Sequence, residues 1–315
     1  MRPAALALVL AGVLAVALVG PAQADEAGDG TAPGTVIWQG SYPEGPVWIG
    51  ATLYWAEMGA DRVMAWSGGT PRVFFERQGC GPTAVARYAR DELLVLCHRD
   101  GSLMRVDARG AALATIREDA DGNRLRNPND ASADGAGGVW LTDPGTFSAQ
   151  ARPEGALYHL APDGRLARHA TGLAYGNGVH VDGARLLLSE HLARRVLAYP
   201  LSGGRLGPPE VLLDLDALGL ARPDYPEAGP DGLEVAPEGT LWVAEYGAGR
   251  LLAWRPGRGL VAAVAVPASY VTNIAFGPGG LAAVTGSFVN DRPPLPGGTW
   301  LLPADRLVEG GIPVR

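Results

Sequence analysis

Six polar residues in this sequence each stand at the start of a short apolar run. They comprise two carboxylates, three amides and one hydroxyl. Carboxylate and amide oxygens, with no cysteine or histidine among them, are the ligands that a hard divalent cation prefers. Two carboxylates that converge without a cation would repel one another. The set therefore predicts one divalent metal ion, with Ca²⁺ favoured and Zn²⁺ or Mn²⁺ as alternatives. The six residues are Glu44, Thr83, Asn129, Asn177, Asp231 and Asn273.

The same positions also have a structural interpretation. Asn-Gly, Asn-Asp and Asp-Gly pairs are typical of turns, where the side chain bonds only to local backbone. The matched placement of Glu44, Asn177 and Asp231 favours metal binding for these three. Thr83 and Asn273 are predicted to be structural, and Asp130 is predicted to be a turn cap rather than a base.

The elements that would position these residues repeat along the chain. Each leading residue is followed by an apolar run, a turn and a second run rich in Trp, Leu and Val, as in residues 230–254. The leading residues are 39, 46, 48, 54 and 42 positions apart, which is the length of a propeller blade. The pattern predicts an all-β fold, a six-bladed β-propeller whose blades are four-stranded antiparallel meanders. A single domain over residues 35–315 is expected.

A propeller would bring these residues to one mouth of its central channel. The innermost strand of each blade starts there, so the leading residues should form an inner ring. The second strands end at the same mouth, farther out. We therefore expect an outer ring drawn from Glu57, His98, Asp143, Glu190, His191 and Glu245. The run at 35–40 should pair with residues 298–303 and close the last blade.

The first 24 residues have the pattern of an export signal. Arg2 precedes an apolar run from Ala4 to Gly20, and Ala22-Gln23-Ala24 resembles a cleavage site. We expect cleavage, with an uncleaved anchor as the alternative, and a disordered lead-in at 25–34. The mature protein would then be periplasmic or secreted, without a stable membrane anchor.

Charge and cysteine content limit the classes of function. The net charge is −7 with no basic cluster, which argues against a nucleic-acid partner. Only two cysteines are present, Cys80 and Cys97, both in the second repeat. In an oxidising compartment they could form a disulfide, and two buried thiols are the alternative.

Several motifs carry a resemblance to a known family. The sequence over residues 40–290 resembles the senescence marker protein/gluconolactonase (regucalcin-like) family. The motifs are 44–48 (EGPVW), 127–130 (NPND), 175–178 (YGNG), 230–233 (PDGL) and 272–277 (TNIAFG). The resemblance implies a six-bladed propeller with one divalent metal and lactone hydrolysis. It implies metal ligation by Glu44, Asn177 and Asp231, and a substrate contact by Asn129. Asn127 stands where several members have an arginine, and it is also expected to contact substrate.

The predicted activity is hydrolysis of a carboxylic ester bond in a small-molecule lactone. The cation would polarise the carbonyl, and Asp231 would accept the proton of the attacking water. His98 is the second candidate for this base and a predicted substrate contact, and Asp143 is a further predicted substrate contact. Two alternatives remain open: a calcium-dependent aryl-ester or organophosphate hydrolase, and a non-catalytic binding propeller with a structural metal.

Overall fold

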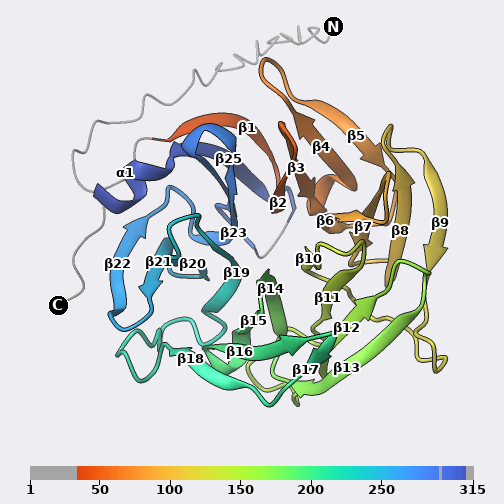
Figure 1. The fold of residues 1–315 in the computed structure, drawn as a ribbon. Helices are drawn as coiled ribbons and strands as arrows, with labels where there is room; N and C mark the ends of the chain where they lie inside the picture. The colour runs from red at the N-terminus through yellow and green to blue at the C-terminus, as the bar shows by residue number, and fades with distance from the viewer. Residues whose placement is uncertain (1–33, 291–292, 310–315) are drawn as a thin grey trace, which may run out of the picture.

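The computed structural model describes residues 34–290 and 293–309, which form an all-β, propeller-like fold (Figure 1). The predicted signal peptide, residues 1–24, lies outside the described residues, as does the predicted lead-in up to residue 33. In the part of the chain that is described, no helix has the length and apolar character that crossing a membrane requires.

Three of the sheets have four antiparallel strands each, ordered along the chain. The first contains β2 (Pro43–Ile49), β3 (Thr52–Glu57), β4 (Arg62–Trp66) and β5 (Arg72–Glu76). The second contains β6 (Pro82–Tyr88), β7 (Glu92–Cys97), β8 (Ser102–Asp107) and β9 (Ala112–Ile116). The third contains β10 (Ala131–Ala133), β11 (Val139–Asp143), β12 (Gly155–Leu160) and β13 (Leu166–Leu173).

The remaining strands form two larger sheets. A five-stranded sheet contains β14 (Gly176–Asp182), β15 (Arg185–Glu190), β16 (Arg195–Ser202), β17 (Arg205–Leu206) and β18 (Glu210–Asp214). An eight-stranded sheet contains β19 (Gly229–Val235), β20 (Leu241–Tyr246), β21 (Arg250–Arg255), β22 (Gly259–Ala265), β23 (Tyr270–Gly277), β24 (Leu281–Ser287), β25 (Pro296–Pro303) and β1 (Thr35–Ser41). Three single 3₁₀ turns and a short helix, α1 (Ala304–Glu309), complete the described elements.

The expectation of six separate blades is not met by the sheet count. The described strands form five sheets, because the strands from β19 to β22 and those from β23 to β1 are joined into one. The join is a single residue pair, Tyr246 with Tyr270. The irregular edge of the fourth sheet, where β17 and β18 both pair with β16, is a second departure from four-stranded meanders.

The first strand of each repeat lies at the centre of the molecule (Figure 1). These strands contact one another in a closed ring, in the order β2, β6, β10, β14, β19 and β23. Second strands such as β11 and β20 are buried along their whole length, whereas outer strands such as β9 and β13 carry exposed residues. This gradient follows from the apolar runs, since second strands such as β11 and β20 are largely apolar on both faces. The sheets therefore hold their inner strand ends rigidly around one axis.

The predicted closure of the ring is confirmed. β1 pairs antiparallel with β25, with Thr35 opposite Leu301 and Gln39 opposite Gly298. A strand from the start of the described chain thus completes the sheet that ends it, which removes one exposed edge.

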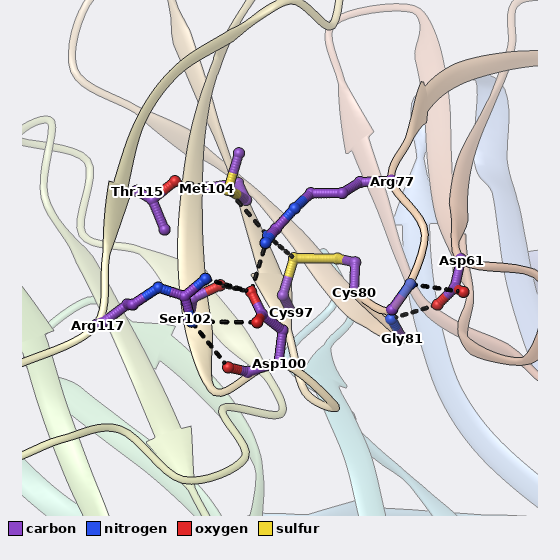
Figure 2. A network of polar contacts seen from close by, with 11 residues as sticks. Asp61, Arg77, Cys80, Gly81, Cys97, Asp100, Ser102, Met104, Thr115 and Arg117 are labelled. Atoms are coloured by element: carbon purple, nitrogen blue, oxygen red, sulfur yellow. Dashed lines mark hydrogen bonds and ion pairs between the residues drawn. A yellow bond between two sulfur atoms is a disulfide. The ribbon is translucent and has the colours of Figure 1, made fainter.

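Cys80 and Cys97 form a disulfide that ties the start of β6 to the end of β7. Figure 2 shows the polar network around it. The Asp100 carboxylate pairs with the guanidinium groups of Arg77 and Arg117 at 2.8 and 2.9 Å. On the other side, the backbone N–H of Gly81 donates to Asp61. The disulfide and these ion pairs together fix the loop before β6.

Candidate functional site

A cavity of about 300 Å³ lies among the leading residues of the repeats. It contains both carboxylates of the predicted inner ring, together with two of its amides and two histidines. Its lining residues are Tyr42, Glu44, Met58, His98, Asn129, Phe147, Tyr175, Asn177, His191, Asp231, Tyr246, Asn290 and Leu295. The structure thus brings Glu44, Asn177, Asp231, Asn129 and His98 together as predicted.

β-Bulges aim the three predicted metal ligands at this cavity. The pairing of β2 with β3 shifts register between Glu44 and Val47. The same irregularity occurs in β14 after Gly176, beside Asn177, and in β19 after Pro230, beside Asp231. A bulge breaks the strict alternation of side chains and turns one residue away from the sheet face. All three predicted ligands accordingly line the cavity.

The glycine after each predicted ligand lets two neighbouring inner strands pack closely. The interpretation of these residue pairs as turns did not predict this role. A Cβ added at Gly178 would overlap the carbonyl oxygen of Asp231 on the next inner strand, β19. A Cβ at Gly232 would overlap the side chain of Asn273 on β23. Adjacent inner strands approach closely only because these positions lack a side chain. The Asn-Gly and Asp-Gly pairs are therefore close-approach points within strands, and not free turns.

The two carboxylates of the cavity are buried and lack a cationic partner among the described residues. Glu44 is 7% exposed and Asp231 is 4% exposed. Burial and the Asp130 carboxylate raise the pKa of Glu44 well above its ordinary value. Burial and the Glu44 carboxylate do the same to the pKa of Asp231. Negative charge here is costly, and a bound cation would relieve that cost.

Asn177 presents an unsatisfied oxygen in the same cavity. Its Oδ1 atom is buried and has no hydrogen-bond partner among the described residues. Its Nδ2 atom lies 3.4 Å from His191 Nδ1, and its amide also bonds to Asp231. An unpaired buried carbonyl oxygen is rare and points to a missing partner such as an ion.

His191 fixes the orientation of that amide. Its Nε2 atom lies 2.8 Å from the backbone oxygen of Glu227, so Nε2 carries the proton and donates it. Nδ1 is then an acceptor, which requires the NH₂ group of Asn177 to face it. Burial lowers the pKa of His191 to about 4, so the ring is neutral at pH 7. His191 thus leaves Asn177 Oδ1 free and directed away from it.

The donor set fits a hard divalent cation. Glu44 and Asp231 supply carboxylate oxygens, and Asn177 supplies an amide oxygen without another partner. In the described residues, no cluster of three or more His, Cys, Asp and Glu side chains could hold a metal. The set proposed here has only two carboxylates and completes its shell with an amide.

His98 and Asn129 contribute further polar groups to the cavity. The Nδ1 atom of His98 is buried and has no hydrogen-bond partner among the described residues. Burial lowers the pKa of His98 to about 4, so the ring is neutral at pH 7 and a weaker base than an exposed histidine. The side chain of Asn129 bonds to Tyr175, whose pKa is raised mainly by burial.

Asn127 and Asp143 do not line the cavity. Asp143 accepts hydrogen bonds from the backbone N–H groups of Arg126 and Asn127, at 2.8 and 2.9 Å. The side chain of Asn127 bonds in both directions to the backbone of Gly145. Both predicted substrate contacts therefore brace the loop that presents Asn129, and their polar atoms already have backbone partners.

Three carboxylates of the predicted outer ring lie in ion pairs outside the cavity. Glu57, Glu190 and Glu245 each pair with the arginine that opens the next strand. Their N–O distances are 2.5, 2.6 and 2.5 Å, to Arg62, Arg195 and Arg250. Each pair joins directly opposed residues of a hairpin. These glutamates stand at the ends of the second strands, as the outer ring requires, but an arginine five positions later pairs with each one and none of them lines the cavity. Of that ring, His98 and His191 are the members that line the cavity among the described residues.

The two inner-ring residues predicted to be structural form hydrogen bonds with backbone groups. Thr83 Oγ1 donates to the Pro128 carbonyl, and Asn273 Oδ1 accepts from the N–H of Ile274. Asp130 accepts from the N–H of Val179 and so links β10 to β14. Asp130 and Asn273 border a separate cavity of about 340 Å³, which also contains Glu234 and His180.

Sequence reasoning missed the aromatic wall of the cavity. The rings of Phe147 and Tyr175 lie 4.9 Å apart, and Phe147 lies 5.4 Å from His191. Tyr246 lies 5.6 Å from His191, and its hydroxyl is 2.7 Å from that of Tyr42. Tyr175 opens the motif at 175–178, Tyr42 stands two residues before Glu44, and Tyr246 directly follows Glu245. That adjacency is the signal that could have identified them.

Comparison with known proteins identifies related sequences and structures. A sequence profile of the family described as SMP-30/Gluconolactonase/LRE-like region matches residues 42–284. The chain is 30% identical over 203 residues to the Bacillus subtilis (strain 168) protein named "Putative sugar lactone lactonase YvrE". That match covers 62% of this chain and 64% of the relative, so the chain spans slightly less than two thirds of the relative's length.

Other relatives match at similar levels. Regucalcin from Gallus gallus is 27% identical over 248 residues, covering 74% of this chain and 78% of regucalcin. Diisopropyl-fluorophosphatase from Loligo vulgaris is 25% identical over 182 residues, covering 54% of this chain and 56% of that enzyme. A solved gluconolactonase from Xanthomonas campestris is 26% identical with a TM-score of 0.68, covering 84% of this chain and 88% of that one. Since the profile spans well over half of the sequence, the chain belongs to the SMP-30/gluconolactonase/LRE-like family.

Proposed function

We propose that this protein is a metal-dependent hydrolase that opens lactone rings. The observation that carries the proposal is the convergence of Glu44, Asp231 and the unpartnered Oδ1 of Asn177 in one cavity. Membership of a family with gluconolactonase members supports the reaction class. The oxygen-only donor set favours Ca²⁺, with Zn²⁺ and Mn²⁺ as alternatives.

The residues around the cavity have distinct roles in this mechanism. When bound, the cation would polarise the lactone carbonyl and stabilise the charge that develops on its oxygen. Glu44, Asn177 and Asp231 hold it, and Asn129 lies where it can contact substrate. Asp231 accepts a proton from water as the water oxygen attacks the carbonyl carbon. The ring C–O bond then breaks, and its oxygen takes up a proton to give the hydroxy acid. His98 Nδ1, which is buried and free, is the second candidate for the base.

Proton release by the full chain tests this proposal. A panel of small lactones is assayed after EDTA treatment and again after addition of Ca²⁺, Zn²⁺ or Mn²⁺. We expect activity to disappear with EDTA and return with a cation, and to be absent in Asp231→Asn at every cation tested. Lactone hydrolysis that survives EDTA, or that Asp231→Asn retains, contradicts the mechanism.

A second candidate is hydrolysis of aryl esters or organophosphates. The similarity to diisopropyl-fluorophosphatase favours it, as do the two cavity histidines, His98 and His191. Adding an aryl ester and a diisopropyl fluorophosphate analogue to the panel separates the two, because the organophosphate releases fluoride on hydrolysis and a lactone does not. A cation-binding chain that hydrolyses neither would be a binding propeller with a structural metal.

We also propose that residues 1–24 are an export signal and that the mature protein is periplasmic or secreted. The Cys80–Cys97 disulfide supports this, because such bonds persist in oxidising compartments. Residues 35–315 would then fold as one domain. The closed ring of six inner strands supports counting the eight-stranded sheet as two blades joined through Tyr246 and Tyr270.

A further inference from the structure

We infer that the cavity selects lactones that carry an apolar alkyl or aryl substituent over polyhydroxylated ones. The inference rests on the proposed lactonase function and names the substrate class of the same site. It comes from the walls of the cavity, and not from the residues that would hold the cation.

Part of the cavity wall is aromatic. The rings of Phe147, Tyr175, His191 and Tyr246 contact one another with centroids 4.9 to 6.0 Å apart. Met58 and Leu295 add aliphatic surface on the remaining sides. Phe147 is 38% exposed, although it is a large apolar side chain. An exposed ring at the edge of an apolar cavity gains free energy when a ligand covers it.

Most polar atoms of that wall already have partners within the protein. The hydroxyls of Tyr42 and Tyr246 bond to each other at 2.7 Å. Asn290 donates to the hydroxyls of Tyr246 and Tyr225. Tyr175 bonds to Asn129, and both ring nitrogens of His191 are engaged. A sugar hydroxyl entering here would lose water without gaining a partner, which is costly.

The charge of the cavity points the same way. Its described lining residues include Glu44 and Asp231 but no arginine or lysine. An anionic substituent that extends beyond the cation would therefore find no cationic side chain among these residues. Among the described lining residues, the buried polar atoms without a hydrogen-bond partner are Asn177 Oδ1 and His98 Nδ1, which the proposed function assigns to the cation and to the second candidate base. Recognition of the rest of the substrate is left to the aromatic wall.

Two lactones with the same six-membered ring test the inference. δ-Decalactone carries a pentyl chain and D-glucono-1,5-lactone carries hydroxyls. We expect kcat/KM of the Ca²⁺-loaded full chain to be at least about 100-fold higher for δ-decalactone. Phe147→Ala should reduce that ratio about tenfold, through a higher KM for δ-decalactone. Phe288→Ala removes an exposed ring outside the cavity and is the matched control, with an unchanged ratio. Equal or reversed preference in the wild type, or no effect of Phe147→Ala, would overturn the inference.

Binding of the corresponding lactams separates this inference from the proposed function. 6-Pentylpiperidin-2-one and D-glucono-1,5-lactam keep the ring and substituents but resist hydrolysis. Tighter calorimetric binding of the pentyl lactam, lost in Phe147→Ala, supports the inference even if no lactone is hydrolysed, and the proposed function alone then fails. Hydrolysis with a preference for the polyol lactone retains the function and overturns the inference. Absence of both hydrolysis and lactam binding overturns both.

Discussion

Carboxylates at two radii of this molecule have opposite surroundings. Glu44 and Asp231, at the starts of inner strands, are buried without an arginine partner. Glu57 and Glu245, at the ends of the second strands of the same repeats, are equally buried and each pairs with an arginine at 2.5 Å. Carboxylates at both radii are buried and belong to the same repeats. They differ in radius and in whether an arginine pairs with them. A buried carboxylate that the protein itself does not neutralise marks a place for a ligand.

The second repeat sharpens this contrast, because it has neither kind of carboxylate. At the last pair of its β7–β8 hairpin, Cys97 faces Ser102 where the first repeat has Glu57 facing Arg62. A disulfide to Cys80 takes the place of the ion pair, and the following residue, His98, lines the cavity. In this repeat, Cys97, which stabilises the fold, and His98, which lines the cavity, are therefore adjacent in the chain.

Glu44→Gln and Glu57→Gln form a matched pair within one blade. Glu44→Gln should lower kcat/KM for a lactone by about 10³-fold, because it removes a cation ligand, while thermal stability is retained. Glu57→Gln should instead destabilise the fold by about 2 kcal/mol, because it weakens the ion pair with Arg62, with kcat/KM near wild type below the melting temperature. Steady-state kinetics and thermal unfolding check both. If the two variants changed kcat/KM and thermal stability alike, inner and outer glutamates would not have the different roles assigned to them.

Replacement of the disulfide tests the structural position of the second repeat. Cys80→Ala/Cys97→Ala should lower the free energy of unfolding by about 3 kcal/mol, since the bond closes a short loop. The two cysteines are 17 positions apart. Urea unfolding with and without reductant provides the measurement, and the double variant should not respond to reductant. A wild type whose unfolding midpoint is unaffected by reductant would contradict this role.

His191→Phe tests the positioning of Asn177. The phenyl ring keeps the aromatic contacts but cannot accept the Asn177 amide, so the amide is free to rotate its oxygen away from the cavity. Cation affinity measured by calorimetry should fall about tenfold. His169→Phe, at an exposed ring outside the cavity, is the control and should bind the cation like wild type. Unchanged affinity in His191→Phe would show that His191 does not orient the ligand.

The smallest expected effect concerns Asp100 beside the disulfide. Burial alone would raise the pKa of Asp100, but hydrogen bonds from Arg117, Ser102 and Arg77 lower it to about 2. A lowered pKa in the folded state stabilises the fold above about pH 4, and that contribution is lost as the pH falls towards about 2. At pH 7, Asp100→Asn should therefore cost about 1 kcal/mol, since the group is partly exposed to solvent. The difference in unfolding free energy between the two proteins should shrink between pH 4 and pH 2. A constant difference would contradict the ion-pair account.

The repeat pattern predicted the inner strands and their leading residues because both depend on local sequence. The turn pairs, apolar runs and blade-length spacing place Glu44, Asn177 and Asp231 at equivalent points without any knowledge of tertiary contacts. The ion pairs of the outer glutamates could also have been found. An arginine follows each at the same spacing, as Arg62 follows Glu57, and a two-stranded hairpin makes such residues neighbours.

Other features depend on contacts between distant segments. Phe147 reaches the cavity from the loop between β11 and β12, and Asn290 reaches it from the loop before β25. Neither loop carries a repeat signal. The merging of two predicted blades through Tyr246 and Tyr270 likewise depends on one backbone pair that no periodicity encodes. The sequence predicts that Asp143 and Asn127 contact substrate. In the structure, backbone N–H groups donate hydrogen bonds to both side chains instead.

Calorimetric titration of Ca²⁺ into the EDTA-treated and dialysed protein tests the central claim most directly. Wild type is compared with Asp231→Asn, at the inner radius, and with Glu245→Gln, at the outer radius. The account predicts one cation per chain for wild type and for Glu245→Gln, and affinity at least about 100-fold weaker for Asp231→Asn. Wild-type affinity in Asp231→Asn, or loss of binding in Glu245→Gln while it remains folded, would contradict it.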